Sequence, residues 1–132
     1  MREILFRGKR TDNGEWIYGD LMQNVDCIKI REQEKDVKHI AKSFEIDLET
    51  VGQYTDLTDK NGKRIFEGDI LKVFGYNYVI MWDSIRAMFY LRDPVYRVTS
   101  DFYNYCGSDL SVIGNIYDNP ELLGGENNGI NR

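Results

Sequence analysis

Two Asn-Gly pairs, each flanked by residues that alternate between apolar and polar, constrain the fold of this chain most. The first pair turns the segment from Arg7 to Leu21 at Asp12-Asn13-Gly14. The second turns the segment from Gln53 to Val73 at Lys60-Asn61-Gly62. Asn-Gly between alternating segments is the strongest short-range signal for a β-hairpin, because both residues tolerate the left-handed backbone of tight turns. The sequence therefore predicts two antiparallel hairpins.

The charges beside these turns favour one loop length. A two-residue loop would set Asp12 opposite Glu15 and Lys60 opposite Lys63, and like charges that face each other across a hairpin are unfavourable. A three-residue loop with a left-handed glycine avoids this conflict and sets Asp59 opposite Lys63 as an opposite-charge pair. We therefore predict three-residue loops in both hairpins, with four turn residues: Asn13, Gly14, Asn61 and Gly62.

The returning arm of the second hairpin is interrupted by Glu67-Gly68-Asp69. A glycine followed by an acid inside a strand pattern usually marks a bulge or corner. We therefore predict a structural bend at Gly68 and Asp69, where the chain leaves one strand partner and begins another strand. Other short strands are predicted at 27–31, 51–55, 76–82, 87–91 and 111–113, and the pair 76–82 and 87–91 forms a third hairpin.

Two segments are typical of capped helical turns, one at 47–50 and one at 119–123, where Pro120 follows Asn119. Segment 33–46 is ambiguous, because its apolar residues have helical spacing but also fit a loop with a short strand. We favour the loop. Residues 124–132 are rich in glycine and asparagine, and we expect them to be disordered.

These elements predict a β-rich fold in which antiparallel hairpins form a partly closed barrel or sandwich, with one or two short helical turns. At 132 residues the chain fits one domain, which we expect to span residues 1–123. No apolar run approaches the roughly 20 residues that cross a bilayer, and the start lacks the apolar segment of a signal peptide. We therefore expect a cytoplasmic protein without a membrane partner.

Metal and cofactor sites are not expected. His39 is the single histidine, and Cys27 and Cys106 lie far apart in the sequence. A zinc site of the Cys/His type needs more ligands, so both cysteines are expected to be free thiols. The glycines are scattered singly and form no phosphate-binding motif. The sequence therefore predicts neither a metal nor a cofactor.

Glu67 and Asp69 are the best catalytic candidates, because two carboxylates two positions apart share one face of a strand. Such a pair can bind a cation or act as an acid and a base. We favour a structural role instead, since an acid at a bend accepts hydrogen bonds from backbone N–H groups. His39 lies among charged residues, where an exposed loop histidine is commoner than a general base. No catalytic residue is predicted, and the chain is expected not to be an enzyme.

The basic start of the chain offers a candidate binding surface. Arg7, Lys9 and Arg10 precede Trp16 and Tyr18, and cations beside aromatic rings suit single-stranded nucleic acid, whose bases stack on the rings. The net charge of −5 argues against bulk attraction to nucleic acid. Tyrosine and tryptophan are also enriched at protein contacts. We therefore favour binding to another protein and self-association into a homo-oligomer, with a nucleic-acid-binding module as the alternative.

Three motifs lie close together in the chain: Val51-Gly52-Gln53-Tyr54-Thr55, Asp59-Lys60-Asn61-Gly62-Lys63 and Ile65-Phe66-Glu67-Gly68-Asp69-Ile70. They resemble the signature of the YopX family of phage and prophage proteins. The opening 1–7 and the closing 113–123 resemble the two ends of that family, whereas Asp56 stands where many members have glycine. The resemblance implies a small phage or prophage protein of the bacterial cytoplasm, with no established activity, cofactor or catalytic residue. With this resemblance, we expect a non-enzymatic accessory protein that binds a host or phage protein, and the alternative is a nucleic-acid-binding module of phage replication or regulation.

Overall fold

The computed structural model describes residues 1–33, 41–95, 99–102 and 109–124. Its described elements are antiparallel strands and short 3-10 turns, which confirms the predicted β-rich class. The strands form two sheets that are not closed into a barrel. The chain divides into two compact units, Met1–Asp56 and Leu57–Arg132. A single domain over 1–123 remains a prediction, and the expected tail lies outside the described residues except for Gly124.

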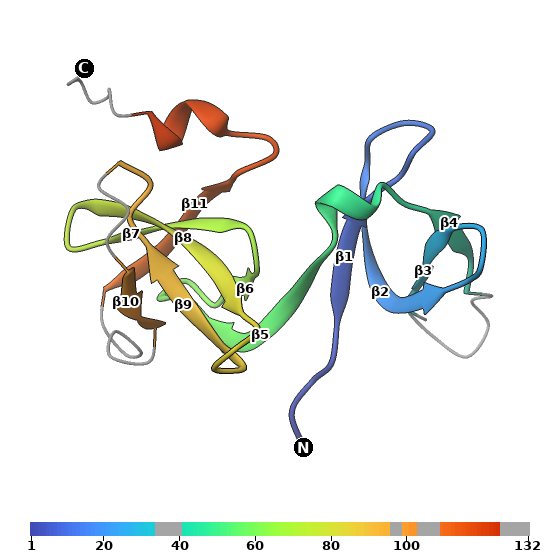
Figure 1. Cartoon of the computed structure of the whole chain (residues 1–132), viewed down its shortest axis with the longest axis horizontal. Coiled ribbons are helices and arrows are strands. Elements are labelled where there is room, and N and C mark those ends of the chain that lie inside the picture. The colour runs from blue at the N-terminus through green and yellow to red at the C-terminus, as the bar shows by residue number, and fades with distance from the viewer. Residues whose placement is uncertain (34–40, 96–98, 103–108, 125–132) are drawn as a thin grey trace. The chain divides into compact units, whose positions relative to one another are not determined.

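The first unit contains a meandering antiparallel sheet (Figure 1). Its elements are β1 (Phe6–Lys9), β2 (Trp16–Gln23), β3 (Ile28–Glu32), β4 (Ser43–Glu45), the 3-10 turn η1 (Leu48–Thr50) and β5 (Gly52–Thr58). The strands lie in the order β4-β3-β2-β1-β5. One face of the sheet holds a core of Ile17, Ile30 and Ile46, against which partly buried residues such as Phe6 and Phe44 pack. The other face is polar and aromatic, and it holds the candidate site.

The second unit begins at Leu57, within β5. Strand β5 pairs with β6 (Arg64–Phe66). The other elements are β7 (Asp69–Val73), β8 (Tyr76–Asp83), β9 (Met88–Arg92), β10 (Thr99–Asp101), β11 (Leu110–Asn115) and the 3-10 turn η3 (Pro120–Leu123). The second sheet has the order β10-β9-β8-β7-β11. Among the described residues of this unit, eight form its buried core, including Ile65, Leu71, Ile80 and Phe102. The predicted third hairpin is present as β8 and β9.

The second hairpin loop has the predicted length. The N–H of Asp59 donates to the carbonyl of Lys63 at 2.8 Å, and the N–H of Gly62 donates to the carbonyl of Asp59 at 3.0 Å. Three residues therefore form the loop, and Gly62 adopts the left-handed φ of 82° that a side chain would disfavour.

The first hairpin loop is longer than predicted. The N–H of Arg10 donates to the carbonyl of Glu15 at 2.9 Å, so residues 11–14 form a four-residue loop. The three-residue prediction was wrong because Thr11 has another partner. Its N–H donates to the carbonyl of Glu45 on β4 at 3.1 Å, and it therefore does not close the hairpin. Gly14 keeps the expected left-handed conformation, with φ of 74°.

The Gly-Asp bend is confirmed. It joins β6 of the first sheet to β7 of the second, and Gly68 has φ of 91°. The predicted turn at 47–50 is also confirmed as η1, where Asp47 accepts the N–H of Glu49 at 3.0 Å. Pro120 begins η3, but the Asn119 side chain does not cap it. In segment 33–46, β4 is the short strand, while residues 34–40 lie outside the described residues.

Candidate functional site

The β1–β2 hairpin brings the predicted cations and aromatic rings together. Arg7 is paired with Tyr18, and Lys9 is paired with Trp16. Directly paired residues of antiparallel strands project from the same face of a sheet, and their Cβ atoms lie about 5 Å apart. The hydrophobic core lies on the opposite face, so these four side chains share the polar face. Local alternation in a hairpin was sufficient to predict this grouping.

The neighbouring strand β3 adds two further cations to this face. Asp20 is paired with Arg31, and Met22 is paired with Lys29. Because side chains alternate with a period of two, Asp20 lies on the same side of β2 as Tyr18, and Arg31 therefore does so too. We define the cationic–aromatic face as the side chains of Arg7, Lys9, Trp16, Tyr18, Lys29 and Arg31.

Trp16 is held by cations of its own sheet. The guanidinium of Arg7 lies 4.7 Å from the ring centroid, and the ammonium of Lys9 lies 5.5 Å from it. A cation within about 6 Å of an indole face is attracted by the ring quadrupole. Arg7 is only 5% exposed, so the cation that orients the indole is a buried side chain. The half-buried Lys9 remains partly accessible to solvent.

Charge is distributed unevenly across the cationic–aromatic face. On β3, the cross-strand partners of the two cations include carboxylates, with Arg31 opposite Asp20 and Lys29 opposite Glu45. On β1, the cross-strand partners on β2 are the aromatic residues Trp16 and Tyr18. Arg7 and Lys9 therefore place two cations next to the two rings on the β1 side. Tyr18 is 41% exposed and offers an accessible ring there.

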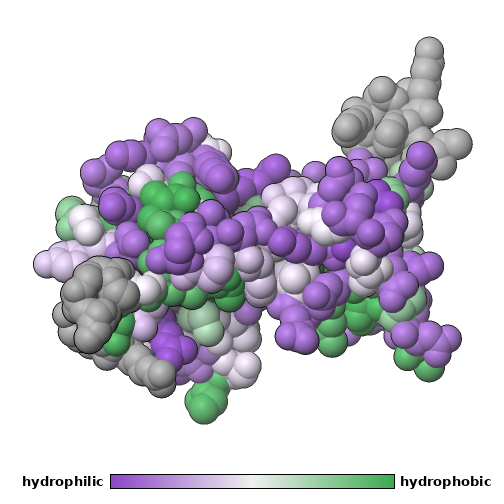
Figure 2. Space-filling model, turned by 90° about the horizontal axis from the view of Figure 1, so that it is seen from above, coloured by the Kyte–Doolittle hydropathy of each residue, from purple (hydrophilic) through white to green (hydrophobic). Residues whose placement is uncertain are grey.

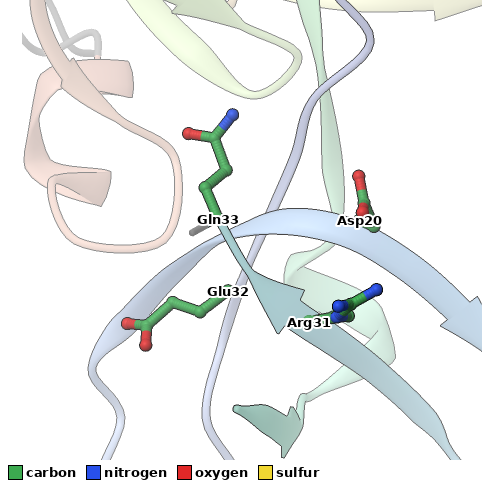
Figure 3. Close-up of a pocket in the computed structure, with 4 residues that line it drawn as sticks. All are labelled: Asp20, Arg31, Glu32 and Gln33. Carbon is green, nitrogen blue, oxygen red and sulfur yellow. The ribbon is translucent and has the colours of Figure 1, made fainter. Parts of the chain in front are cut away.

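A polar depression lies over β2 and β3, lined by Asp20, Arg31, Glu32 and Gln33, with a volume of about 400 Å³ (Figure 3). The Arg31 and Glu32 side chains leave β3 in opposite directions. The N–H of Gln33 donates to the carbonyl of Tyr18 at 3.4 Å, so the depression adjoins the exposed ring. The depression extends the cationic–aromatic face, and it is an open surface depression and not an enclosed cavity.

Arg10 does not share this face, although the sequence grouped it with Arg7 and Lys9. Its guanidinium lies 4.2 Å from the centroid of Phe44, which packs against the core on the opposite face. Two hydrogen bonds join it to the Asp12 carboxylate at 2.6 and 2.9 Å. The hydrogen bond from Asp12 raises the pKa of Arg10, and the bond from Arg10 lowers the pKa of Asp12. Arg10 therefore belongs to the hairpin turn.

One carboxylate of the pair Glu67 and Asp69 accepts a backbone hydrogen bond at the bend. Asp69 is 2% exposed, and its Oδ2 accepts the N–H of Phe66 at 2.8 Å across the bend. Glu67, which the sequence placed beside it, is half-buried at the bend itself. A buried carboxylate that accepts a backbone hydrogen bond stabilises the local chain path. The predicted structural role of Gly68 and Asp69 agrees with this geometry.

Asp59 is a second buried acid. The sequence placed it beside the turn of the second hairpin, but its contact with β11 was not predicted. Its Oδ1 accepts the N–H groups of Asn61 and Lys63 at 2.8 and 2.9 Å, and its Oδ2 accepts that of Val112 at 2.9 Å. Burial raises the pKa of Asp59, but the three N–H donors outweigh it and hold the pKa below its ordinary value. Asp59 therefore ties the loop to β11.

The remaining candidate sites are limited to the residues that the structure describes. Within them, no group of three or more His, Cys, Asp or Glu side chains could hold a metal ion, and no helix is long and apolar enough to span a membrane. Cys27 is a half-buried free thiol. His39 and Cys106 lie outside the described residues.

Comparison with known families settles the relationship of this chain. The family model described as YopX protein matches residues 5–124, which include both hairpins and the Gly-Asp bend. The chain belongs to the YopX family. The suggested resemblance is therefore confirmed over most of the chain.

A solved structure has a similar fold. The chain is similar to the crystal structure of protein EF1440 from Enterococcus faecalis, with 27% sequence identity and a TM-score of 0.57. The match covers 93% of this chain and 99% of that one. No curated protein matches the sequence.

The closing motif of this YopX chain has a structural explanation. The N–H of Asn115 donates to the Asn119 Oδ1 at 3.1 Å, and Asn115 Oδ1 accepts the N–H groups of Tyr117 and Asp118. A Cβ on Gly114 would lie 2.5 Å from the Asn119 Oδ1, so glycine is needed there. Asn119 therefore closes the turn after β11, which explains why it does not cap η3.

Sequence reasoning missed Lys29 and Arg31 as members of the face. The signal was available, because Lys29 and Arg31 alternate with the apolar Ile28 and Ile30. With the isoleucines directed to the core, the two cations had to project from the opposite face. What the sequence did not reveal is the register that places β3 beside the aromatic strand β2.

Proposed function

We propose that this YopX chain is a non-enzymatic accessory protein of a phage or prophage, active in the bacterial cytoplasm, that binds another macromolecule through the cationic–aromatic face. The observation that carries the proposal is the pairing of Arg7 with Tyr18 and of Lys9 with Trp16 on the face opposite the hydrophobic core. An exposed ring beside concentrated positive charge is a recognition surface.

The buried acids of the second unit support a binding role over a catalytic one. Asp59 and Asp69 both use carboxylate oxygens to accept backbone N–H groups. A general base has to reach the proton of a substrate, and these oxygens are directed to the chain instead. The depression over β2 and β3 is open and polar, unlike the mostly apolar clefts that hold small substrates.

The surface also favours a polar partner. In Figure 2, hydrophobic side chains form separate patches on a largely hydrophilic surface. Protein pairs that associate permanently bury large apolar areas, and scattered apolar residues are normal on soluble proteins.

The proposal includes self-association of the chain, which sedimentation velocity tests. An oligomer supports self-association, and a monomer at all concentrations removes that part of the proposal.

Capture from lysate of an induced host tests the proposal. Immobilised wild-type protein is compared with the double variant Lys9→Glu/Tyr18→Ala. The matched control is Lys72→Glu/Tyr76→Ala, which makes the same changes at exposed residues of the second unit. Loss of the captured macromolecules in the first variant, with retention in the control, supports the proposal. Identical capture by all three proteins contradicts it.

A further inference from the structure

We infer that the ligand of the cationic–aromatic face is a single-stranded nucleic acid. This inference rests on the proposed function, because it names the partner of the same face. The face has three parallel rows of side chains. The central strand β2 carries Trp16 and Tyr18, while β1 carries Arg7 and Lys9 on one side and β3 carries Lys29 and Arg31 on the other.

This order of rows matches the two chemical parts of an unpaired strand. On β1, Lys9 is paired with Trp16 and Arg7 with Tyr18, whereas on β3 Arg31 is paired with Asp20 and Lys29 with Met22. Lys9 and Arg31 are therefore the diagonal neighbours of Tyr18 on the two adjacent strands, about 7–8 Å away. Single-strand binders combine a positive groove for the phosphates with rings on which successive bases stack. Tyr18, exposed at 41%, provides the accessible ring, and Lys9 and Arg31 provide charge on opposite sides of it.

The buried arginine of the face has a different role. Arg7 is 5% exposed and lies against the Trp16 indole, so it is a positioning residue and does not reach a phosphate. Lys9 also lies over this indole, but it is only half-buried. Arg7 therefore orients the Trp16 indole, and a base stacked on Tyr18 would lie beside that indole.

A double helix fits this face poorly. The bases of a duplex are already stacked on one another, so an exposed tyrosine on a sheet has no base face to contact. Phosphates alone would attract both forms of nucleic acid, whereas the ring discriminates between them. Exposed Tyr18 thus predicts a preference for single strands over duplexes.

An acidic protein is the main competing partner, and the composition of the face argues against it. Lysine is depleted at protein contacts, yet Lys9 and Lys29 both belong to the face. The net charge of −5 further confines attraction for a polyanion to these local cations.

The salt dependence of binding should be modest. Lys9, Lys29 and Arg31 are the half-buried or exposed cations of the face, and three phosphate contacts are an upper limit because Lys29 and Arg31 lie opposite Glu45 and Asp20. For single strands, the logarithm of the affinity falls with the logarithm of the salt concentration by about 0.7 for each phosphate neutralised, which gives a slope near −2 for three contacts. Strong binders with many phosphate contacts have much steeper slopes.

Fluorescence anisotropy with labelled oligonucleotides tests the inference. The probes are oligo-dT and oligo-U of about 12 nucleotides, within the usual site size of single-strand binders, and a DNA duplex of the same length. Titrations run from about 50 to 300 mM salt, the range over which phosphate contacts alter affinity. The full chain is used throughout, and the thermal unfolding of each variant is recorded to show that it folds.

The wild type is expected to bind a single strand more tightly than the duplex, and the two single-stranded probes show whether DNA or RNA is preferred. Tyr18→Ala should weaken binding by roughly tenfold with little change in the salt slope, because it removes one stacking contact. Lys9→Glu should weaken binding and reduce the slope by about 0.7. The controls Tyr76→Ala and Lys72→Glu should bind like the wild type.

Three results would overturn the inference: no binding at the lowest salt, equal affinity for duplex and single strand, or unchanged affinity in folded Tyr18→Ala. These outcomes differ from failure of the proposed function. If lysate capture depends on the face but survives nuclease, the partner is a protein, and only the inference fails. If neither lysate capture nor oligonucleotide binding responds to the face variants, the proposed function fails as well.

Discussion

The carboxylate Oδ2 of Asp59 accepts a hydrogen bond from the backbone N–H of Val112 at 2.9 Å, although the two residues are 53 positions apart in the sequence. The same carboxylate also holds the Asn-Gly loop of the second hairpin through Asn61 and Lys63. One side chain therefore fixes the loop and its attachment to β11. The hydrogen bonds of Asp59 to Asn61 and Lys63 explain the motif at 59–63 structurally.

The first prediction concerns the removal of this charge. In Asp59→Asn, an amide nitrogen replaces one carboxylate oxygen, so one backbone N–H group loses its acceptor. A buried polar group left without its partner costs on the order of 1–3 kcal/mol. Urea unfolding should show a loss of that size. Asp109→Asn is the control, because it removes only the exposed ion pair with Lys60 and should cost less than about 1 kcal/mol. Equal losses would contradict this role of Asp59.

The second prediction follows from the lowered pKa of Asp59. A carboxyl whose pKa is lower in the folded state than in the unfolded state stabilises the fold above its unfolded value of about 3.9. This contribution disappears as the pH falls through the folded pKa. The difference in unfolding free energy between wild type and Asp59→Asn should therefore be constant near neutral pH and shrink below about pH 4. A difference that persists unchanged to pH 2.5 would refute the linkage.

Local signals in the sequence predict the hairpins well, but not all of their contacts. Asn61-Gly62 gave the correct loop because its charges and turn residues are neighbours in the chain. Asn13-Gly14 gave a loop one residue too short, because Thr11 bonds to Glu45, which only the folded sheet brings near. Likewise Arg10 follows Lys9 in the chain but lies against Phe44 on the other face. Contacts set by strand register are invisible to a local pattern.

The third prediction tests the close approach of β2 and β3 beneath the site. A Cβ on Gly19 would lie 1.9 Å from the carbonyl oxygen of Arg31, so the two strands would have to separate. Overpacking of this kind costs about 1–3 kcal/mol. Amide hydrogen exchange in Gly19→Ala should accelerate along β2 and β3. Gly14→Ala is the control, because nothing lies within 4 Å and only its left-handed backbone is strained. Faster exchange confined to the hairpin tip in both variants would show that the close approach is not needed.

The fourth prediction concerns Asp56, which has φ of 70° at the end of the first unit. Glycine adopts this left-handed conformation without steric cost. Both Asp56→Gly and Asp56→Ala lose the hydrogen bond from the N–H of Glu3 at 3.2 Å. The alanine variant should be less stable than the glycine variant by about 1 kcal/mol, measured by thermal unfolding. The opposite order would mean that the backbone relaxes to another conformation.

The candidate site was partly predictable for the same physical reason as the hairpins. The alternation of β1 and β2 groups Arg7, Lys9, Trp16 and Tyr18, and this follows from the sequence alone. The contribution of β3 depends on the pairing of Asp20 with Arg31, which joins segments without a short turn signal between them. The burial of Arg7 under Trp16 also required the structure, because an arginine near the start of a chain is ordinarily exposed.

Chemical-shift mapping tests the central claim most directly. Backbone amide spectra of the ¹⁵N-labelled chain are recorded while oligo-dT is added at low salt. The account predicts that the largest shifts fall on β1, β2 and β3, around Lys9, Trp16, Tyr18 and Arg31, with Tyr76 and Lys72 unchanged. Shifts centred on the second unit, or no shifts at saturating oligonucleotide, would contradict the assignment of the cationic–aromatic face as a binding surface for single strands.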